Sequence, residues 1–281
     1  MREELLLSES KEAESAKNGV MAVRNGTIMV LGVSSAPGLG LSVSRKFARE
    51  GYRVGMIGRT QENLERCAGI IREEKEAAKV QFKVADVGNA EDDLSSALDS
   101  LAVELCDGAH PLRGIVYNAS ARSFPKSPVH EIEIERRLRD VAASECGFIS
   151  SVRWALPRIK DNDGEDKDET EARGVVLVTG ATASMRGSAN FGSFCASKGA
   201  LRDLAMSLAK EQLKEGIHVA HIIVDGMIDM QVIRTMMQGT MQQGRLIDPD
   251  AIADVYWFLF NQKRSCFTFE LDVRPSLSDW S

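Results

Sequence analysis

The sequence predicts a single α/β domain with a doubly wound parallel sheet of about seven strands and helices on both faces. Short apolar runs rich in β-branched residues alternate with helical patterns along most of the chain. These runs are apolar almost throughout, which is typical of strands that are covered on both faces. The length of 281 residues is at the upper end for one such domain.

The expected strands and helices alternate along the chain. We expect strands at 27–33, 53–57, 81–84, 114–117, 175–179 and 218–224, with a seventh candidate at 267–273. Helical patterns occupy 39–50, 60–78, 91–105, 132–159 and 192–214. In the first helix, Leu39, Val43 and Phe47 are four residues apart on one face, and Gly51 marks its end. Right-handed crossovers place the carboxyl ends of parallel strands at one edge, where ligands bind.

Two segments lie outside this pattern. Residues 1–26 form an N-terminal extension that we expect to be flexible. Five Glu among its first fourteen residues disfavour a mitochondrial transit peptide, and it lacks the apolar stretch of a secretory signal. Residues 161–171 hold seven acidic residues and one Lys, which predicts a mobile acidic insert within the domain that spans 27–281. The spacing of these acids does not match a calcium-binding loop.

Composition disfavours several classes of function. The net charge of −6 and a pI near 5.4 argue against a general nucleic-acid binder. The acidic insert accounts for this charge by itself, so the rest of the chain is balanced. No apolar run approaches the ~18 residues of a membrane span. The five Cys are scattered without a CxxC pair, which argues against a disulfide scaffold or a metal site and favours a reducing, cytoplasmic setting.

A short turn between the first expected strand and helix has the pattern of a phosphate-binding turn. Its sequence is Ser34-Ser35-Ala36-Pro37-Gly38-Leu39-Gly40. Gly38 and Gly40 would let the backbone approach a pyrophosphate, and the helix N-terminus supplies N–H donors and a partial positive charge. A plain tight turn is the alternative interpretation.

The residue after the second expected strand bears on the choice of cofactor. Proteins that bind the adenosine ribose 2′-OH typically carry an acid at this position, whereas here it is Arg59. A guanidinium suits a 2′-phosphate, so we expect NADP(H) to be preferred over NAD(H). The alternative is a solvent-facing Arg at the start of a helix.

Further motifs make the chain, from Thr27 to its C-terminus, resemble the short-chain dehydrogenase/reductase family. The motifs are Ala85-Asp86-Val87, Tyr117-Asn118-Ala119-Ser120, Ser197-Lys198 after Phe194, and Gly216-Ile217-His218-Val219 followed by Asp225-Gly226. The resemblance implies a Rossmann-type domain with a nicotinamide cofactor. It assigns Asp86, beside Val87, to the adenine amino group. It also places Asn118 and Ala119 on the adenosine side and Ile228 near the nicotinamide amide.

The departures from the family pattern concern the catalytic residues. Phe194 occupies the position of the family's Tyr, Ala181 that of its Ser and Ser144 that of its Asn, while Lys198 is retained. Ser34 also replaces the first glycine of the turn. Phe194 has no exchangeable proton, and loss of a general acid costs ~10²–10⁴-fold in rate. Hydride transfer is slowed by this loss but is not forbidden.

Two residues could supply a proton instead of the missing Tyr. Thr182 adjoins the vacated Ser position, and Lys198 could act if desolvation lowered its pKa. Loop hydrogen bonding is the alternative role for Thr182, and holding the cofactor ribose is the alternative role for Lys198. Reduction of an activated C=N or C=C bond, with water as proton source, would need neither.

Three further features complete the sequence interpretation. The segment 226–244 holds five Met and suits a mobile lid over an apolar substrate, with a packed helix pair as the alternative. His218 and His221 show no acidic partner at useful spacing and are interpreted as structural. The resemblance implies a homodimer or homotetramer formed through the helices at 132–159 and 192–214.

Two functions follow. The first is an NADP(H)-dependent oxidoreductase that acts on a small, largely apolar carbonyl or imine through an atypical site. The second is a nucleotide-binding sensor or scaffold of the same fold without turnover. The pair Phe194 and Ala181 favours the second function. Lys198, Asn118 and Arg59 fit the first, although cofactor binding alone would also explain them.

Overall fold

The computed structural model describes residues 25–34, 37–89, 93–120, 126–162, 170–236 and 244–278. Its main sheet has seven parallel strands in the order β3-β2-β1-β4-β5-β6-β9. The strands are β1 (Thr27–Leu31), β2 (Arg53–Gly58), β3 (Val80–Val84), β4 (Leu112–Tyr117), β5 (Gly174–Thr179), β6 (Ile217–Val224) and β9 (Glu270–Val273). The predicted doubly wound sheet is confirmed, including its seventh strand.

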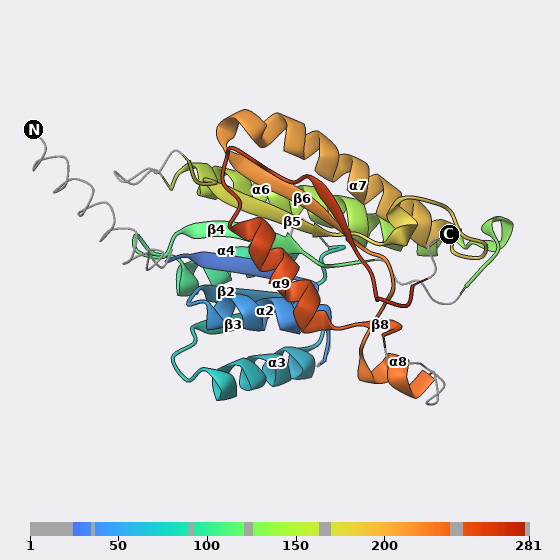
Figure 1. Cartoon of the computed structure of the whole chain (residues 1–281), viewed down its shortest axis with the longest axis horizontal. Helices are drawn as coiled ribbons and strands as arrows, with labels where there is room; N and C mark the ends of the chain where they lie inside the picture. The colour runs from blue at the N-terminus through green and yellow to red at the C-terminus, as the bar shows by residue number, and fades with distance from the viewer. Residues whose placement is uncertain are drawn as a thin grey trace, which may run out of the picture.

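Helices cover both faces of this sheet (Figure 1). One face carries α2 (Leu39–Arg49), α3 (Gln61–Glu74) and α9 (Pro249–Phe260). The other face carries α4 (Ser95–Leu105), α6 (Gly147–Lys160) and α7 (Gly192–Gln212). A separate pair of short strands, β7 (Met227–Ile228) and β8 (Leu246–Ile247), lies beyond β6 together with α8 (Gln231–Met236). No described helix combines the length and apolarity needed to cross a membrane.

The helix expected at 132–159 is present from Ile134 to Lys160, but a π-helical turn divides it into two α-helical parts. The first, α5 (Ile134–Val141), continues into a π-helical turn at Ala142–Cys146, and α6 follows. The hydroxyl of Tyr117 donates to the carbonyl oxygen of Ala143 at 2.5 Å, inside that turn. A π-turn leaves carbonyl groups free of the regular helical pattern, and such turns are frequent at functional sites.

Two other helices are shorter than predicted. The helix expected at 60–78 ends at Glu74, where Lys75 turns its ammonium toward the carbonyl oxygens of Ala48 and Arg49 at the end of α2. The helix expected at 91–105 is regular only from Ser95. The N-terminal extension 1–26 and the acidic insert 161–171 fall largely outside the described residues.

An aromatic cluster joins α2 and α9 on one face of the sheet. Phe47 and Tyr52 meet Phe260 edge-on, with ring centroids 5.0 and 5.1 Å apart, and Trp257 stacks on Phe260 at 5.7 Å. Such aromatic pairs contribute beyond the apolar area that they bury. The cluster therefore holds α9 against α2.

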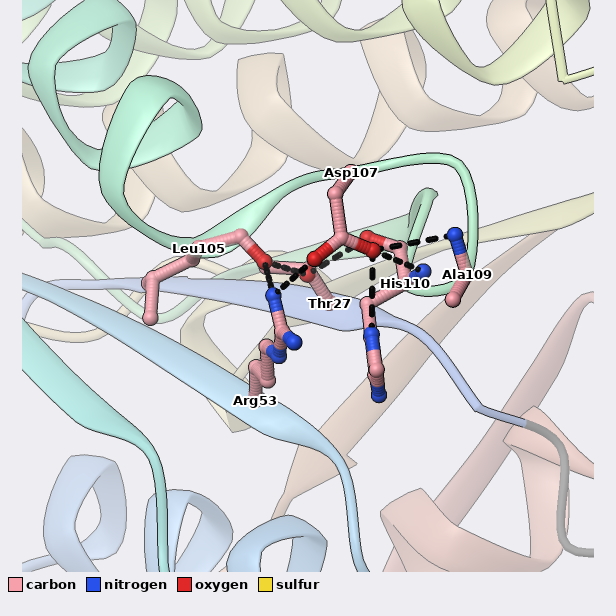
Figure 2. Close-up of polar contacts among 6 residues, drawn as sticks. All are labelled: Thr27, Arg53, Leu105, Asp107, Ala109 and His110. Carbon is pink, nitrogen blue, oxygen red and sulfur yellow. Dashed lines mark hydrogen bonds and ion pairs between the residues drawn. The ribbon is translucent and has the colours of Figure 1, made fainter.

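A polar network joins elements at the amino edge of the sheet, where β1 and β2 begin (Figure 2). The hydroxyl of Thr27 lies 3.0 Å from the carbonyl oxygens of both Leu105 and His110. Arg53 donates to the Leu105 carbonyl at 2.9 Å and to Asp107 at 2.7 Å. Hydrogen bonds from His110, followed by Arg53, hold the pKa of the Asp107 carboxyl well below its ordinary value. The end of α4 is thus tied to the starts of β1 and β2.

Helix α9 offers a matched test of the packing. Phe260 is 2% exposed within the aromatic cluster, whereas Phe258 on the same helix is 59% exposed. Phe260→Ala should lower the free energy of unfolding by about 3–5 kcal/mol, because it empties a buried aromatic site. Phe258→Ala should change it by about 0.5 kcal/mol or less. Urea denaturation measures both, and similar losses for the two variants would contradict this packing.

Candidate active site

The turn between β1 and α2 lies at the carboxyl edge of the sheet, as predicted. Gly38 precedes α2 in extended conformation, and no side chain caps the helix start. The first turn of α2 contains no acidic residue, and Leu39 and Gly40 are buried there. The first N–H groups of the helix are therefore suited to receive an anion such as a phosphate.

A glycine that the sequence analysis did not single out shapes this turn. Gly32 directly follows β1 and has φ at 93°, and a Cβ atom there would lie 2.4 Å from the amide nitrogen of Ala119. Only glycine combines this conformation with such a close approach. Ser34 is exposed and does not take a positive φ, so it replaces the family's glycine without left-handed backbone. Ser35 lies outside the described residues.

Two residues predicted to contact the adenosine half follow the neighbouring strands β2 and β3. Arg59 is exposed and makes no hydrogen bond or ion pair with any residue that the structure describes. Asp86 accepts a hydrogen bond from the Gly88 amide at 2.9 Å and donates its own amide to Asp93 at 3.0 Å. Val87, next in the chain, is buried. The carboxylate of Asp86 thus shapes its own turn while staying at the surface.

A chain of hydrogen bonds converges on Thr179, at the end of β5. The amide of Asn118 donates to the carbonyl oxygen of Gly32 at 3.0 Å, and its own oxygen accepts from the Thr179 hydroxyl at 3.0 Å. The hydroxyls of Thr179 and Tyr256 are 2.6 Å apart. Since the Thr179 hydrogen points to Asn118, the Tyr256 hydroxyl donates to Thr179. These bonds join β1, β4, β5 and α9.

Lys198 reaches the same strand end from α7. Its side chain is buried, and its Nζ donates to the carbonyl oxygen of Thr179 at 2.7 Å. Burial lowers the pKa of this amine to about 8, because the charged form is deprived of solvent. A lowered pKa of this kind is the condition under which Lys198 could act as an acid.

The two vacated positions carry no proton-transferring side chain. Ala181 follows β5, and its amide donates to the Ser184 hydroxyl at 3.1 Å. Phe194 is half-buried on α7, one turn before Lys198. Thr182, the other predicted donor, gives its hydroxyl hydrogen to Asp225.

Asp225 connects Thr182 to the C-terminal segment. Its second oxygen is 2.7 Å from Arg274 Nη1, and Arg274 also binds Asp272 at 3.1 Å. The proton of Thr182 therefore faces a carboxylate, and Thr182 would move a proton only together with Asp225. The sequence offered a signal for Asp225, since it stands where the family has the Pro of a Pro-Gly pair.

Ser144 lies inside the π-helical turn, on the side of the molecule where this turn packs against α7. It is buried, and its hydroxyl oxygen has no hydrogen-bond partner among the described residues. A buried hydroxyl without a partner is costly and is typical of a place where water or a ligand binds.

His221, which shows no acidic partner at useful spacing in the sequence, has one in the folded chain. Its Nδ1 lies 2.9 Å from Glu270, which Arg202 grips with two hydrogen bonds of 2.6 and 2.8 Å. The two partners are 49 residues apart in sequence, so spacing could not reveal them. Burial, with the cations Lys198 and Arg202, lowers the pKa of His221, while Glu270 opposes this.

The other ring nitrogen of His221 lies against Gly180, the residue after β5. Nε2 has no hydrogen-bond partner among the described residues, and a Cβ atom on Gly180 would lie 2.2 Å from it. Glycine is required here by this close approach rather than by a positive φ. The ring nitrogens of His218, in contrast, lie 3.0 Å from the Leu259 carbonyl and 2.8 Å from that of Thr268, and a neutral ring donates to one of the two.

The Met-rich segment is partly described. Ile228 lies in β7, half-buried, and pairs with Ile247 of β8. Asp229 and Arg234 form an ion pair at the start of α8. Residues 237–243 lie outside the described part, so the lid prediction is not tested. Among the residues described, no group of three or more His, Cys, Asp or Glu is arranged for a metal ion.

Comparison with known proteins places this site in a family. Residues 27–241 match the short chain dehydrogenase family. An uncharacterized oxidoreductase of Listeria monocytogenes is 23% identical, over 92% of this chain and all of the relative. The chain therefore belongs to the short-chain dehydrogenase family, and it is an oxidoreductase of that type.

Solved structures agree on the fold. A short-chain dehydrogenase from Rhodopseudomonas palustris is 28% identical, with a TM-score of 0.69 over 90% of this chain and 99% of the other. An apo short chain oxidoreductase from Pseudomonas aeruginosa, described as containing an atypical catalytic center, is 19% identical. Its TM-score is 0.75, over 91% of this chain and 98% of that one.

The lowered pKa of Lys198 predicts a pH-dependent stability. The pKa falls from 10.5 to about 8 in the folded chain, so between these values the unfolded chain binds more protons. Stability due to Lys198 therefore rises with pH across this window. Relative to Lys198→Met, the wild-type free energy of unfolding should rise by about 2 kcal/mol from pH ~8 to ~10.

Urea denaturation at a series of pH values measures this difference. Lys210→Met, an exposed lysine on the same helix, is the control and should show no such trend. If the difference in free energy of unfolding between wild type and Lys198→Met is also independent of pH, the amine keeps its ordinary pKa in the folded chain.

Proposed function

We propose that this protein is an NADP(H)-dependent oxidoreductase that reduces a small, largely apolar carbonyl or imine at a site without the usual Tyr and Ser. The observation that carries this proposal is the buried amine of Lys198, held by Thr179 beside the vacated positions. An amine whose pKa is close to neutral pH can give a proton and be reprotonated readily.

The residues at the carboxyl edge fit a dinucleotide. The uncapped start of α2, at Gly38 to Gly40, would hold the pyrophosphate, and Ser34 and Ser35 would flank it. Asp86, Val87, Asn118 and Ala119 would line the adenosine side, and Lys198 and Ile228 the nicotinamide side. When bound, the nicotinamide would supply the hydride. Arg59 would hold the 2′-phosphate, since it is exposed and has no partner among the described residues.

Lys198 would protonate the substrate oxygen or nitrogen in this proposal. Its ammonium has three N–H groups, of which one is given to Thr179, so others are left for a substrate or a water. Thr182 is the weaker candidate donor because its hydrogen is committed to Asp225. An imine suits the site well, since it can enter already protonated.

A nucleotide-binding sensor or scaffold is the second candidate function. The observation that favours it is the combined loss of acid groups at Phe194 and Ala181, with Thr182 engaged elsewhere. The residues proposed to contact the dinucleotide would bind it equally well in a protein that catalyses no reaction.

We further propose a homo-oligomer, dimer or tetramer, in the cytoplasm. Ile134 and Leu138 of α5 are 67% and 61% exposed, which is unusual for large apolar side chains one turn apart. A second copy of the chain would cover them. All five Cys are free, as expected for a reducing compartment.

The choice of cofactor is tested at Arg59. Arg59→Ala should weaken NADPH binding by at least about tenfold and leave NADH binding nearly unchanged, because a charge-assisted contact to the 2′-phosphate is lost. Calorimetric titration with each nucleotide measures this. Arg66→Ala, an exposed arginine on the neighbouring helix α3, is the control. Equal losses for the two nucleotides would defeat the 2′-phosphate assignment, and no binding of either would sink both candidate functions.

The hydroxyl groups that Ala181 and Phe194 lack can be introduced by mutation. The double change Ala181→Ser and Phe194→Tyr should install or raise ketone reduction, by about 10²–10⁴-fold where wild type is slow, since it supplies a general acid and a substrate-orienting hydroxyl. NADPH oxidation with a panel of ketones and imines measures the rates. A wild type that already reduces ketones faster than the double variant would mean that the chain has its own efficient acid. No turnover by wild type on any ketone or imine would instead favour the sensor.

A further inference from the structure

A small pocket lies between the start of α7, the start of α5 and the segment before α5. Phe191 and Phe194 contribute aromatic rings, Ile132 an apolar side chain, and Ser127, Asn190 and Arg136 polar groups. Phe194 occupies the family's Tyr position, and Lys198 follows one turn later on the same side of the helix. The pocket therefore adjoins the candidate reaction site.

Arg136 is the charged residue among the described residues that line this pocket, and none of those residues is acidic. Although half-buried, Arg136 makes no hydrogen bond or ion pair within the described part of the chain. Its neighbour Arg137, in contrast, donates to the Ser197 hydroxyl at 2.5 Å and lies 3.5 Å from Glu145. A partly buried guanidinium without a counter-ion presents a planar set of donors that matches a carboxylate.

The pocket wall is held in an uncommon conformation. Asn190 has φ at 67°, and no other described non-glycine residue has a positive φ. Its carbonyl oxygen accepts the Ser127 amide at 3.0 Å, which joins the two sides of the pocket. Asn is one of the few non-glycine residues that take this left-handed conformation routinely, so residue 190 suits the tight turn before α7. The ammonium of Lys126 lies 4.9 Å from the Phe191 ring centroid and brings a second cation to the rim.

A buried contact fixes the helix that carries Arg136. The Ser193 hydroxyl donates to Asp140 at 2.7 Å, and both side chains are buried. Asp140 lies one turn after Arg136 on α5, so the guanidinium is presented from a helix that is locked against α7.

We propose that this pocket binds a carboxylate of the substrate, with Arg136 as its counter-ion and the rings of Phe191 and Phe194 against the adjoining apolar group. The substrate would then be a small apolar oxo acid or imino acid. This inference rests on the proposed oxidoreductase site, because the carboxylate end would be held here while the reducible group faces Lys198.

Two probes of the same shape test the charge requirement. Phenylacetate and its neutral analogue phenylacetamide are titrated calorimetrically into the full chain with saturating NADPH. Wild type should bind phenylacetate at least about tenfold more tightly, as a charge-assisted pair predicts. Arg136→Gln should abolish this preference, and Arg136→Lys should keep part of it. Arg139→Gln, an exposed arginine on the same helix, should keep it in full.

Three results would overturn the inference: equal binding of the two probes by wild type, no binding of either, or a preference that survives in Arg136→Gln. Titration with NADPH alone is run beside these. A chain that does not bind NADPH contradicts the proposed function. The preference for phenylacetate over phenylacetamide is then compared between wild type and Arg136→Gln without nucleotide, and this comparison tests the carboxylate site by itself.

Discussion

The hydrogen bonds at Thr179 are the interaction on which the candidate site depends. Tyr256 donates to Thr179, Thr179 to Asn118 and Asn118 to the Gly32 carbonyl, so that each donor in the chain has one acceptor. The carbonyl of Thr179 accepts Lys198. One residue at the end of strand β5 thus links the turn after β1 to the lysine on α7. The adenosine and nicotinamide halves of the proposed cofactor site are therefore both hydrogen-bonded to β5.

This arrangement gives Lys198 an unusual environment for an ammonium group. Its one described partner is a carbonyl, and burial, together with the cations Lys198 and Arg202, lowers the imidazole pKa of its neighbour His221. Neither group compensates a full positive charge, which explains why burial dominates the lysine's pKa. In the proposed reaction, Lys198 takes over as proton donor from the Tyr that the family has at position 194.

The sequence was sufficient for the sheet but not for the details of the site. All seven strands were predicted because buried parallel strands have a strong local signature in apolar, β-branched runs. The π-helical turn between α5 and α6 was missed, since it involves the Tyr117 hydroxyl, which reaches the turn from a distant strand. The His221–Glu270 pair and the Thr182–Asp225 pair were missed for the same reason: their partners meet only after folding. Lys198, Phe194 and Ala181 could be placed in advance because the family motif fixes their spacing.

The polar network at the amino edge also bears on how the protein can be handled. Thr27 begins β1 at this edge, and Asn162, which leads into the acidic insert, donates to the carbonyl of Leu112 at the start of β4. Thr170, on the far side of the insert, accepts from the amide of Arg264 shortly before β5 begins. The N-terminal extension and the insert therefore both join the domain at the edge away from the nucleotide turn. A tag, a fluorophore or a surface linkage attached at either place would leave the ligand-facing edge open to solution.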